Sequence, residues 1–133
     1  MFKKRDNIKE VEEGKYLEPK FDENGLIPVI TTDFKTGDIL MHGYMNDEAL
    51  KKTIETKEAY YWSRSRKKIW HKGQISGFVQ TIKEIRIDDD QDSVWLSVDI
   101  GNGAIDRNNF TRTSEHHSAF TLVIQRFVKI RYV

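Results

Sequence analysis

The sequence contains no cysteine, and this absence restricts the chemistry open to the protein. Disulfide bonds, thiolate metal ligands and a cysteine nucleophile are all excluded. Any metal site must take its ligands from histidine, aspartate and glutamate side chains. Since only 4 residues are histidine and 21 are acidic, carboxylates are the most numerous candidate ligands.

Long apolar segments and an excess of charge of either sign are also missing. No stretch reaches the roughly 18 apolar residues of a membrane span, and the charged start of the chain lacks the hydrophobic region of a secretion signal. The 22 basic side chains almost balance the 21 acidic ones, so net charge indicates no polyanionic partner. These absences predict a cytoplasmic protein without membrane or nucleic-acid partners.

The length of 133 residues suits one compact domain. Residues 1–20 alternate in charge without an apolar period, and Pro19 discourages a helix from running onward. We expect residues 1–20 to form an N-terminal arm outside the core. Residues 21–133 are expected to form a single domain.

Strand patterns are frequent in the proposed domain. Short apolar or alternating runs predict strands at residues 26–30, 39–41, 59–62, 84–87, 94–100 and 120–133. Asn46, followed by two acidic residues, is a favourable helix start. The polar, basic residues 63–68 are expected to form a loop, where binding residues often lie.

Four aspartates occupy the five positions 88–92, between two predicted strands. Their carboxylates repel one another at neutral pH, so this connection is stable when it is fully solvated or when a cation neutralises it. Asp88, Asp90 and Asp92 share one side of an extended chain, and their oxygens suit magnesium first and calcium second. A solvated acidic turn is an equal alternative.

A basic segment with aromatic residues runs through positions 62–73. Its guanidinium, hydroxyl and ammonium groups are those that bind a phosphate or a ribose phosphate. The same composition also fits a solvated loop, or a nucleic-acid surface on which Trp62 and Trp70 stack with bases. Next to strands, both tryptophans fit core packing at least as well. Gly73 and Gly77 allow either close approach to a ligand or a tight turn.

Three histidines are candidates for metal binding or proton transfer, because imidazole does both near neutral pH. They are His71, His116 and His117. Adjacent histidines in a polar loop are more often exposed than functional, so the pair at 116 and 117 has a plain alternative.

In their order and spacing, several motifs resemble those of the phosphoribosyl-AMP cyclohydrolase family. They are NGLIP (24–28), LM (40–41), YMN (44–46), EAL (48–50), YWSRSR (61–66), Trp70, KG (72–73), SG (76–77) and VQ (79–80). The match is clearest over residues 21–104, which include the acidic element.

The resemblance implies hydrolysis of the N1–C6 bond in the adenine ring of phosphoribosyl-AMP, a step of histidine biosynthesis. It implies an α+β, mostly β domain with one or two helices, assembled as an intertwined homodimer with active sites at the subunit interface. The implied magnesium ligands are Asp88, Asp90 and Asp92. The implied substrate-binding residues are Ser63, Arg64, Ser65, Arg66, Lys72, Gly73, Ser76 and Gly77. A zinc-bound water is the nucleophile that the family implies.

The sequence departs from the family where zinc is concerned, because the family's three zinc cysteines are absent. Asp89 stands at the first of those positions, and Ala119, between Ser118 and Phe120, stands at the closest counterpart of the last. No assignment of catalytic residues follows from the sequence.

Three explanations of this departure stay open. Asp89, His116 and His117 are chemically adequate ligands for a rebuilt zinc site, which would also admit manganese or cobalt more readily. Alternatively, the chain keeps nucleotide binding without zinc-dependent hydrolysis. The third explanation is a tail altered by divergence or by a shifted reading frame.

Overall fold

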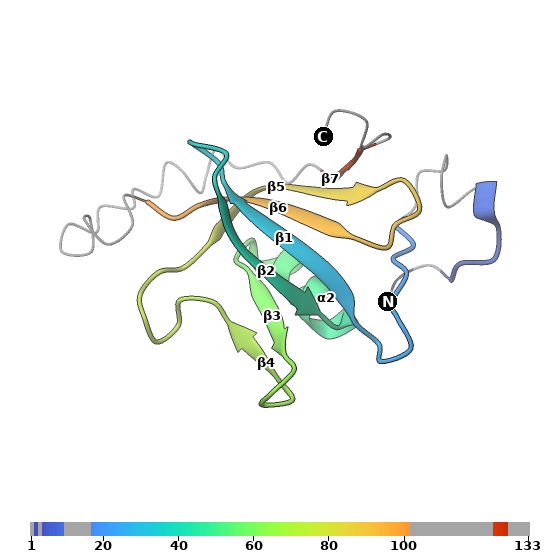
Figure 1. Cartoon of the computed structure of the whole chain (residues 1–133), viewed down its shortest axis with the longest axis horizontal. Helices are drawn as coiled ribbons and strands as arrows, with labels where there is room; N and C mark the ends of the chain where they lie inside the picture. The colour runs from blue at the N-terminus through green and yellow to red at the C-terminus, as the bar shows by residue number, and fades with distance from the viewer. Residues whose placement is uncertain (1, 3, 10–16, 102–123, 128–133) are drawn as a thin grey trace.

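The computed structural model describes residues 2, 4–9, 17–101 and 124–127, and Figure 1 shows their arrangement. The elements are β1 (Ile27–Asp33), β2 (Ile39–Met45), α2 (Asp47–Thr56), β3 (Tyr60–Ser63), β4 (Lys68–His71), β5 (Thr81–Asp88), β6 (Val94–Asp99) and β7 (Ile124–Phe127). Most of the ordered structure is strand, so the expected α+β, mostly β class is confirmed. The described residues contain one labelled helix, within the expected one or two.

The main sheet has five strands in the order β2-β1-β6-β5-β7. Strands β1 and β2 form an antiparallel hairpin, as do β5 and β6, while β1 runs parallel to β6 and β5 parallel to β7. Strands β3 and β4 form a separate antiparallel pair that projects below the main sheet in Figure 1. The two hairpins of the main sheet therefore meet along the β1–β6 pair.

The core lies on one face of the main sheet. In β6, Val94, Leu96 and Val98 are buried, whereas the residues between them are only half-buried, as the alternating sequence pattern predicted. Helix α2 packs against β3 and β2 and buries Leu50 within this core. Burial of these apolar side chains is the main source of stability for the sheet.

Helix α2 begins where the sequence predicted. The side chain of Asn46 accepts a hydrogen bond of 2.8 Å from the backbone N–H of Ala49, which satisfies a free donor of the first turn. Asp47 and Glu48 follow in that turn and interact favourably with the helix dipole. The helix ends at Thr56 and is followed by the C-cap residue Lys57, whose backbone is left-handed with φ of 63°.

A buried polar network joins β3 to the main sheet. The Tyr61 hydroxyl donates to Oε1 of Gln80 at 2.6 Å, and it therefore accepts from the Thr31 hydroxyl at 2.6 Å. Burial raises the pKa of Tyr61 above its ordinary value, so the phenol stays neutral. The network fixes the position of β3, from which the basic loop projects.

The described N-terminal residues lie beside the turn between β5 and β6 (Figure 1). The backbone N–H of Lys20 donates to the carbonyl of Gln91 at 2.7 Å, and both Glu18 and Pro19 are buried. The division of the chain into an arm and a domain at residue 20 stays a prediction. No helix among the described residues is long and apolar enough to cross a membrane.

Candidate functional site

Residues 88–92, four aspartates and Gln91, run from the end of β5 through the turn to β6, and Asp88 closes that turn. Its Oδ1 accepts hydrogen bonds from the backbone N–H groups of Asp92 at 2.8 Å and Ser93 at 3.0 Å. Its own N–H donates to the carbonyl of Ser93 at 3.1 Å. Part of the role of Asp88 is therefore structural, as in the plain alternative of an acidic hairpin turn.

The turn brings together the three carboxylates that the sequence singled out. Asp88, Asp90 and Asp92 offer oxygen atoms that all lie within 4.8 Å of one another. Asp88 is buried, Asp92 is half-buried and Asp90 is exposed. Three converging carboxylate oxygens fit a hard divalent cation, which makes this turn a possible metal site.

The electrostatics of the turn disfavour ionisation of all its carboxyl groups at once. Burial, followed by hydrogen bonding and repulsion from Asp92 and Asp90, raises the pKa of Asp88 to about 7. The hydrogen bond from Asp88 holds the pKa of Asp92 below its usual range. A proton is therefore kept in the group up to about neutral pH, and a bound cation would take its place.

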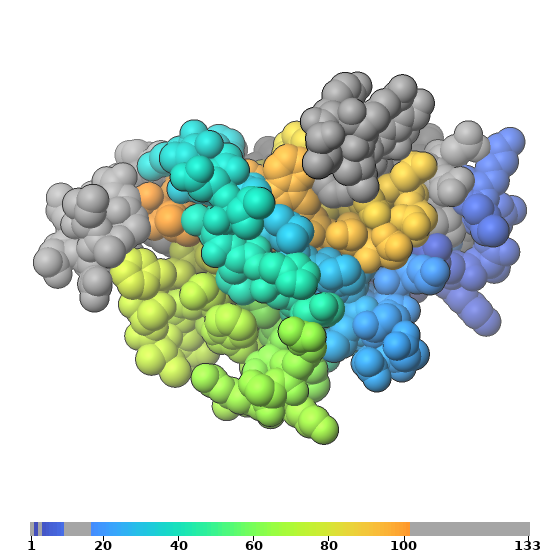
Figure 2. All heavy atoms as spheres, in the orientation of Figure 1, coloured from blue at the N-terminus to red at the C-terminus, as the bar shows by residue number. Residues whose placement is uncertain are grey.

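A second feature is a basic hollow beside the β3–β4 hairpin, with a volume of about 610 Å³. Figure 2 shows the residues of this region, in green and yellow-green, on the open surface below the main sheet. The size is within the range of small-molecule sites. Six of the eight predicted substrate-binding residues line it, namely Ser63, Ser65, Arg66, Lys72, Gly73 and Ser76.

Arg64 and Gly77 do not line the hollow. The guanidinium carbon of Arg64 lies 4.1 Å from the centre of the Tyr44 ring, which is a cation–π contact with β2. Two residues on, Arg66 lines the hollow. The structure therefore separates two arginines that the sequence treated as equivalent.

Gly73 has a structural reason to be glycine. Its backbone has φ of 89°, and a Cβ atom there would lie 2.2 Å from the backbone nitrogen of Val79. Gly77 also has a positive φ, of 83°, but the space around its missing Cβ is open. The sequence allowed either close approach to a ligand or a tight turn at Gly73. The structure favours the tight turn, because the atoms nearest to a Cβ there belong to the chain's own backbone.

Several lining residues were not among the predicted binding residues. They are Lys68, Ile69, Trp70, His71, Gln74 and Ile75. The sequence fitted core packing at least as well for both tryptophans, but Trp70 is 36% exposed and Trp62 is half-buried. Ile75 is 98% exposed at the edge of the hollow. Lys68, Ile69, Trp70 and His71 lie on β4, whose one partner among the described strands is β3, and Gln74 and Ile75 lie in the loop that follows β4.

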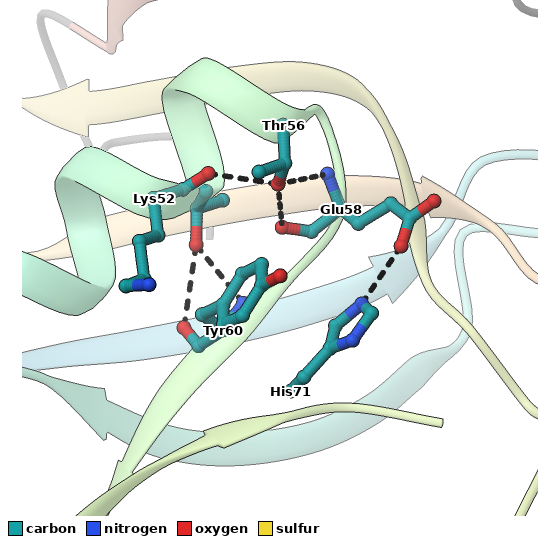
Figure 3. A network of polar contacts seen from close by, with 6 residues as sticks. Lys52, Thr56, Glu58, Tyr60 and His71 are labelled. Carbon is teal, nitrogen blue, oxygen red and sulfur yellow. Dashed lines mark hydrogen bonds and ion pairs between the residues drawn. The ribbon is translucent and has the colours of Figure 1, made fainter. Parts of the chain in front are cut away.

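His71 has a defined orientation, shown in Figure 3. Its Nε2 lies 2.7 Å from Oε1 of Glu58, the residue preceding Ala59 and β3. Its ring stacks on Tyr60 with 4.4 Å between centroids and an angle of 10°. These contacts hold the imidazole at the wall of the hollow, where it is available for proton transfer or for a polar ligand contact.

The expected zinc ligands fall largely outside the described residues. His116 and His117 belong to the part of the chain that is not described, and Asp89 is half-buried but does not join the group of three carboxylates. A site built from Asp89, His116 and His117 therefore stays a prediction. The described residues include no second cluster of this kind.

The fold and these features define a small α+β domain that combines an acidic turn suited to a divalent cation with a basic hollow suited to an anionic ligand. The chain belongs to the phosphoribosyl-AMP cyclohydrolase family, whose model matches residues 41–111. This confirms the resemblance that the sequence motifs indicated.

Curated relatives with the name phosphoribosyl-AMP cyclohydrolase support the assignment. A protein of Rhodopseudomonas palustris strain TIE-1 is 56% identical over 95 residues, which are 71% of this chain and 63% of the relative. A protein of strain BisB18 is 57% identical over 97 residues, or 73% of this chain and 66% of the relative. A Nitrobacter winogradskyi protein is 53% identical over 90 residues, which are 68% of this chain and 62% of the relative. The chain thus spans slightly less than two thirds of the length of these relatives.

Proposed function

We propose that the chain hydrolyses the N1–C6 bond of the adenine ring of phosphoribosyl-AMP, a reaction of histidine biosynthesis. The observation that carries the proposal is the basic hollow, with Arg66 and Lys72 in its lining, on a chain of the cyclohydrolase family. Phosphoribosyl-AMP, with its two phosphates and two ribose groups, has the negative charge and the hydroxyls that such a lining binds. The cytoplasm, predicted from the sequence, is the proposed location.

The hollow offers groups that complement a phosphate, a ribose and a purine ring of the substrate. Arg66 and Lys72 would supply positive charge for a phosphate, and the hydroxyls of Ser63, Ser65 and Ser76 would supply hydrogen bonds. Trp70, at the wall of the hollow, offers a flat face for the purine ring. Arg64 would have to leave Tyr44 to join this set, and Gly77 would contribute only backbone.

For the cation, we propose magnesium at Asp88, Asp90 and Asp92. The convergence of the three carboxylates and the raised pKa of Asp88 support this assignment, because a bound cation would relieve the repulsion that both reflect. When bound, magnesium supplies positive charge to a phosphate or carbonyl oxygen of a ligand. The turn itself contributes the fixed arrangement of oxygen ligands.

We further propose that two copies of the chain form the working enzyme. In Figure 1 the β5–β6 turn lies at the right end of the main sheet, while the loop after β4 lies at the left. The acidic turn and the basic hollow are therefore far apart within one chain. A homodimer in which the turn of one copy approaches the hollow of the other would unite them at an interface.

A second function is favoured by the absence of cysteine. In this alternative the chain binds the nucleotide or a phosphoribosyl group without zinc-dependent hydrolysis. The two functions differ in the role of Asp89, His116 and His117. Hydrolysis needs a rebuilt metal site from such residues, whereas binding alone needs only the hollow.

Turnover of phosphoribosyl-AMP by the purified chain, with metal content measured on the same sample, tests both functions. Turnover that follows added zinc, and that His116→Ala and His117→Ala abolish together with zinc binding, would support the rebuilt site. Absence of turnover, with nucleotide binding that Arg66→Ala weakens, would support the alternative. Absence of both turnover and nucleotide binding would overturn the two functions.

A further inference from the structure

Gln91 has an unusual position for a residue in an acidic turn. Its side chain is fully buried, with 0% exposure, although the preceding Asp90 is exposed. Its backbone is left-handed, with φ of 58°, a conformation that is costly for a residue with a Cβ atom. The surrounding contacts must offset both this strain and the burial of an amide.

Those contacts come from the N-terminal segment. Oε1 of Gln91 accepts a buried hydrogen bond of 2.7 Å from the backbone N–H of Glu18. The carbonyl of Gln91 accepts a second one, also of 2.7 Å, from the N–H of Lys20. On its other side, the N–H of Gln91 donates to the carbonyl of Asp88 at 3.0 Å. Gln91 therefore connects the N-terminal segment to the first carboxylate residue of the turn.

Arg5 makes an independent connection between the same two parts. Its Nη1 donates to the carbonyl of Glu18 at 2.8 Å and to the carbonyl of Asp90 at 2.9 Å. One guanidinium nitrogen thus joins the N-terminal segment to the second carboxylate residue. Figure 1 shows this segment, in blue, alongside the β5–β6 turn.

We propose that Arg5 and residues 17–20 act as a latch that holds the acidic turn in its cation-binding geometry, with Gln91 as the positioning residue. Gln91 stands between Asp90 and Asp92 in the sequence. Anchoring its side chain therefore fixes the backbone from which the carboxylates of both aspartates project. The proposal rests on the acidic turn being the cation site. The latch residues are distinct from the three carboxylates that would hold the cation.

The latch makes cation binding and the ordering of the N-terminal segment reciprocal. If the docked segment favours convergence of the carboxylates, then a bound cation must favour docking of the segment by the same factor. Magnesium should therefore protect the backbone N–H groups of Glu18 and Lys20 from hydrogen exchange. A latch with a purely structural role would leave magnesium affinity unchanged in folded variants.

The test is magnesium binding to the full-length chain by calorimetry, with circular dichroism to confirm folding. Arg5→Ala and Gln91→Ala are expected to weaken magnesium affinity roughly three- to tenfold, the range of one or two lost hydrogen bonds. Arg5→Lys, which keeps one donor nitrogen, should retain most of the affinity. Lys4→Ala is the matched control, because it removes the same charge from an exposed neighbour.

The direction of the Arg5→Ala effect separates the latch from simple electrostatics. Loss of a positive charge near a cation site should strengthen cation binding, whereas loss of the latch should weaken it. Unchanged or tighter binding in folded Arg5→Ala, with magnesium still lost in Asp90→Asn, would overturn the latch and leave the cation site standing. If the unaltered chain binds no magnesium, or if Asp90→Asn binds it equally well, both ideas fail. If Gln91→Ala does not fold, Arg5→Ala and hydrogen exchange of the unaltered chain still test the latch.

Discussion

The guanidinium of Arg64 lies over the ring of Tyr44, 4.1 Å from its centre, and this contact separates Arg64 from Arg66. Only Arg66 lines the basic hollow. The pair therefore offers a matched comparison of two arginines, two positions apart, in one exposed loop.

We expect Arg66→Ala to weaken AMP binding about tenfold or more, because a charge-assisted contact to phosphate is lost. Arg64→Ala should change AMP affinity by less than about threefold and should lower stability by about 0.5–1 kcal/mol, the range for an exposed cation–π pair. Calorimetric titration with AMP and urea unfolding measure the two effects. Equal losses of affinity in both variants would show that Arg64 leaves Tyr44 to bind the ligand.

Gly73 and Gly77 are a second matched pair, since both have positive φ. Gly77→Ala should cost about 1–2 kcal/mol, the penalty of the left-handed backbone alone. Gly73→Ala should cost clearly more, over about 3 kcal/mol, because the new Cβ would lie 2.2 Å from the Val79 nitrogen and the loop must move. The free energy of unfolding in urea is the measurement. Similar costs in the two variants would contradict the close approach at Gly73.

The acidic turn should make metal-free protein less stable as pH rises. Burial raises the pKa of Asp88 from 3.8 to about 7, so the folded state binds a proton that the unfolded chain releases. This contribution is complete below about pH 4 and is lost as pH rises through 7. It is at most about 4 kcal/mol, and the lowered pKa of Asp92 opposes part of it.

Thermal unfolding in chelator between pH 5 and pH 8 measures this loss. Asp88→Asn is the control, because its side-chain oxygen can still accept the hydrogen bonds from Asp92 and Ser93 but has no proton to release. Magnesium should restore stability at pH 8, since it replaces the lost proton. The same pH dependence in Asp88→Asn would show that other groups cause it.

Tyr61→Phe should lower stability by about 1–3 kcal/mol, because Thr31 and Gln80 each lose a buried hydrogen-bond partner. Tyr60→Phe is the control. The Tyr60 hydroxyl makes no hydrogen bond to the described residues, and its ring would still stack on His71. Chemical denaturation of the two variants compares them. A Tyr60→Phe cost as large as that of Tyr61→Phe would show that loss of the buried network does not explain the destabilisation.

Local structure was largely predictable from the sequence, because its signals depend on neighbouring residues. Alternation in β6 and the capping residue Asn46 correctly predicted a strand and a helix start. The spacing of Asp88, Asp90 and Asp92 predicted three carboxylates on one side of an extended chain. Their oxygens do come together, but in a turn with a left-handed Gln91 rather than in an extended strand. For the strand and the helix start, a contiguous segment carries all the information that the prediction needs.

Only the tertiary structure decided which of the two arginines faces the hollow, because that choice depends on Tyr44, which lies on a different strand. It also placed Glu18 against Gln91, residues separated by 73 positions, and Arg5 against Asp90, separated by 85. Neither contact is indicated by a sequence period or a capping motif. The sequence alone determined the family, most of the strands and the acidic composition of the turn, whereas long-range pairing determined how that turn is held, since distant contacts form only when the whole sheet has assembled.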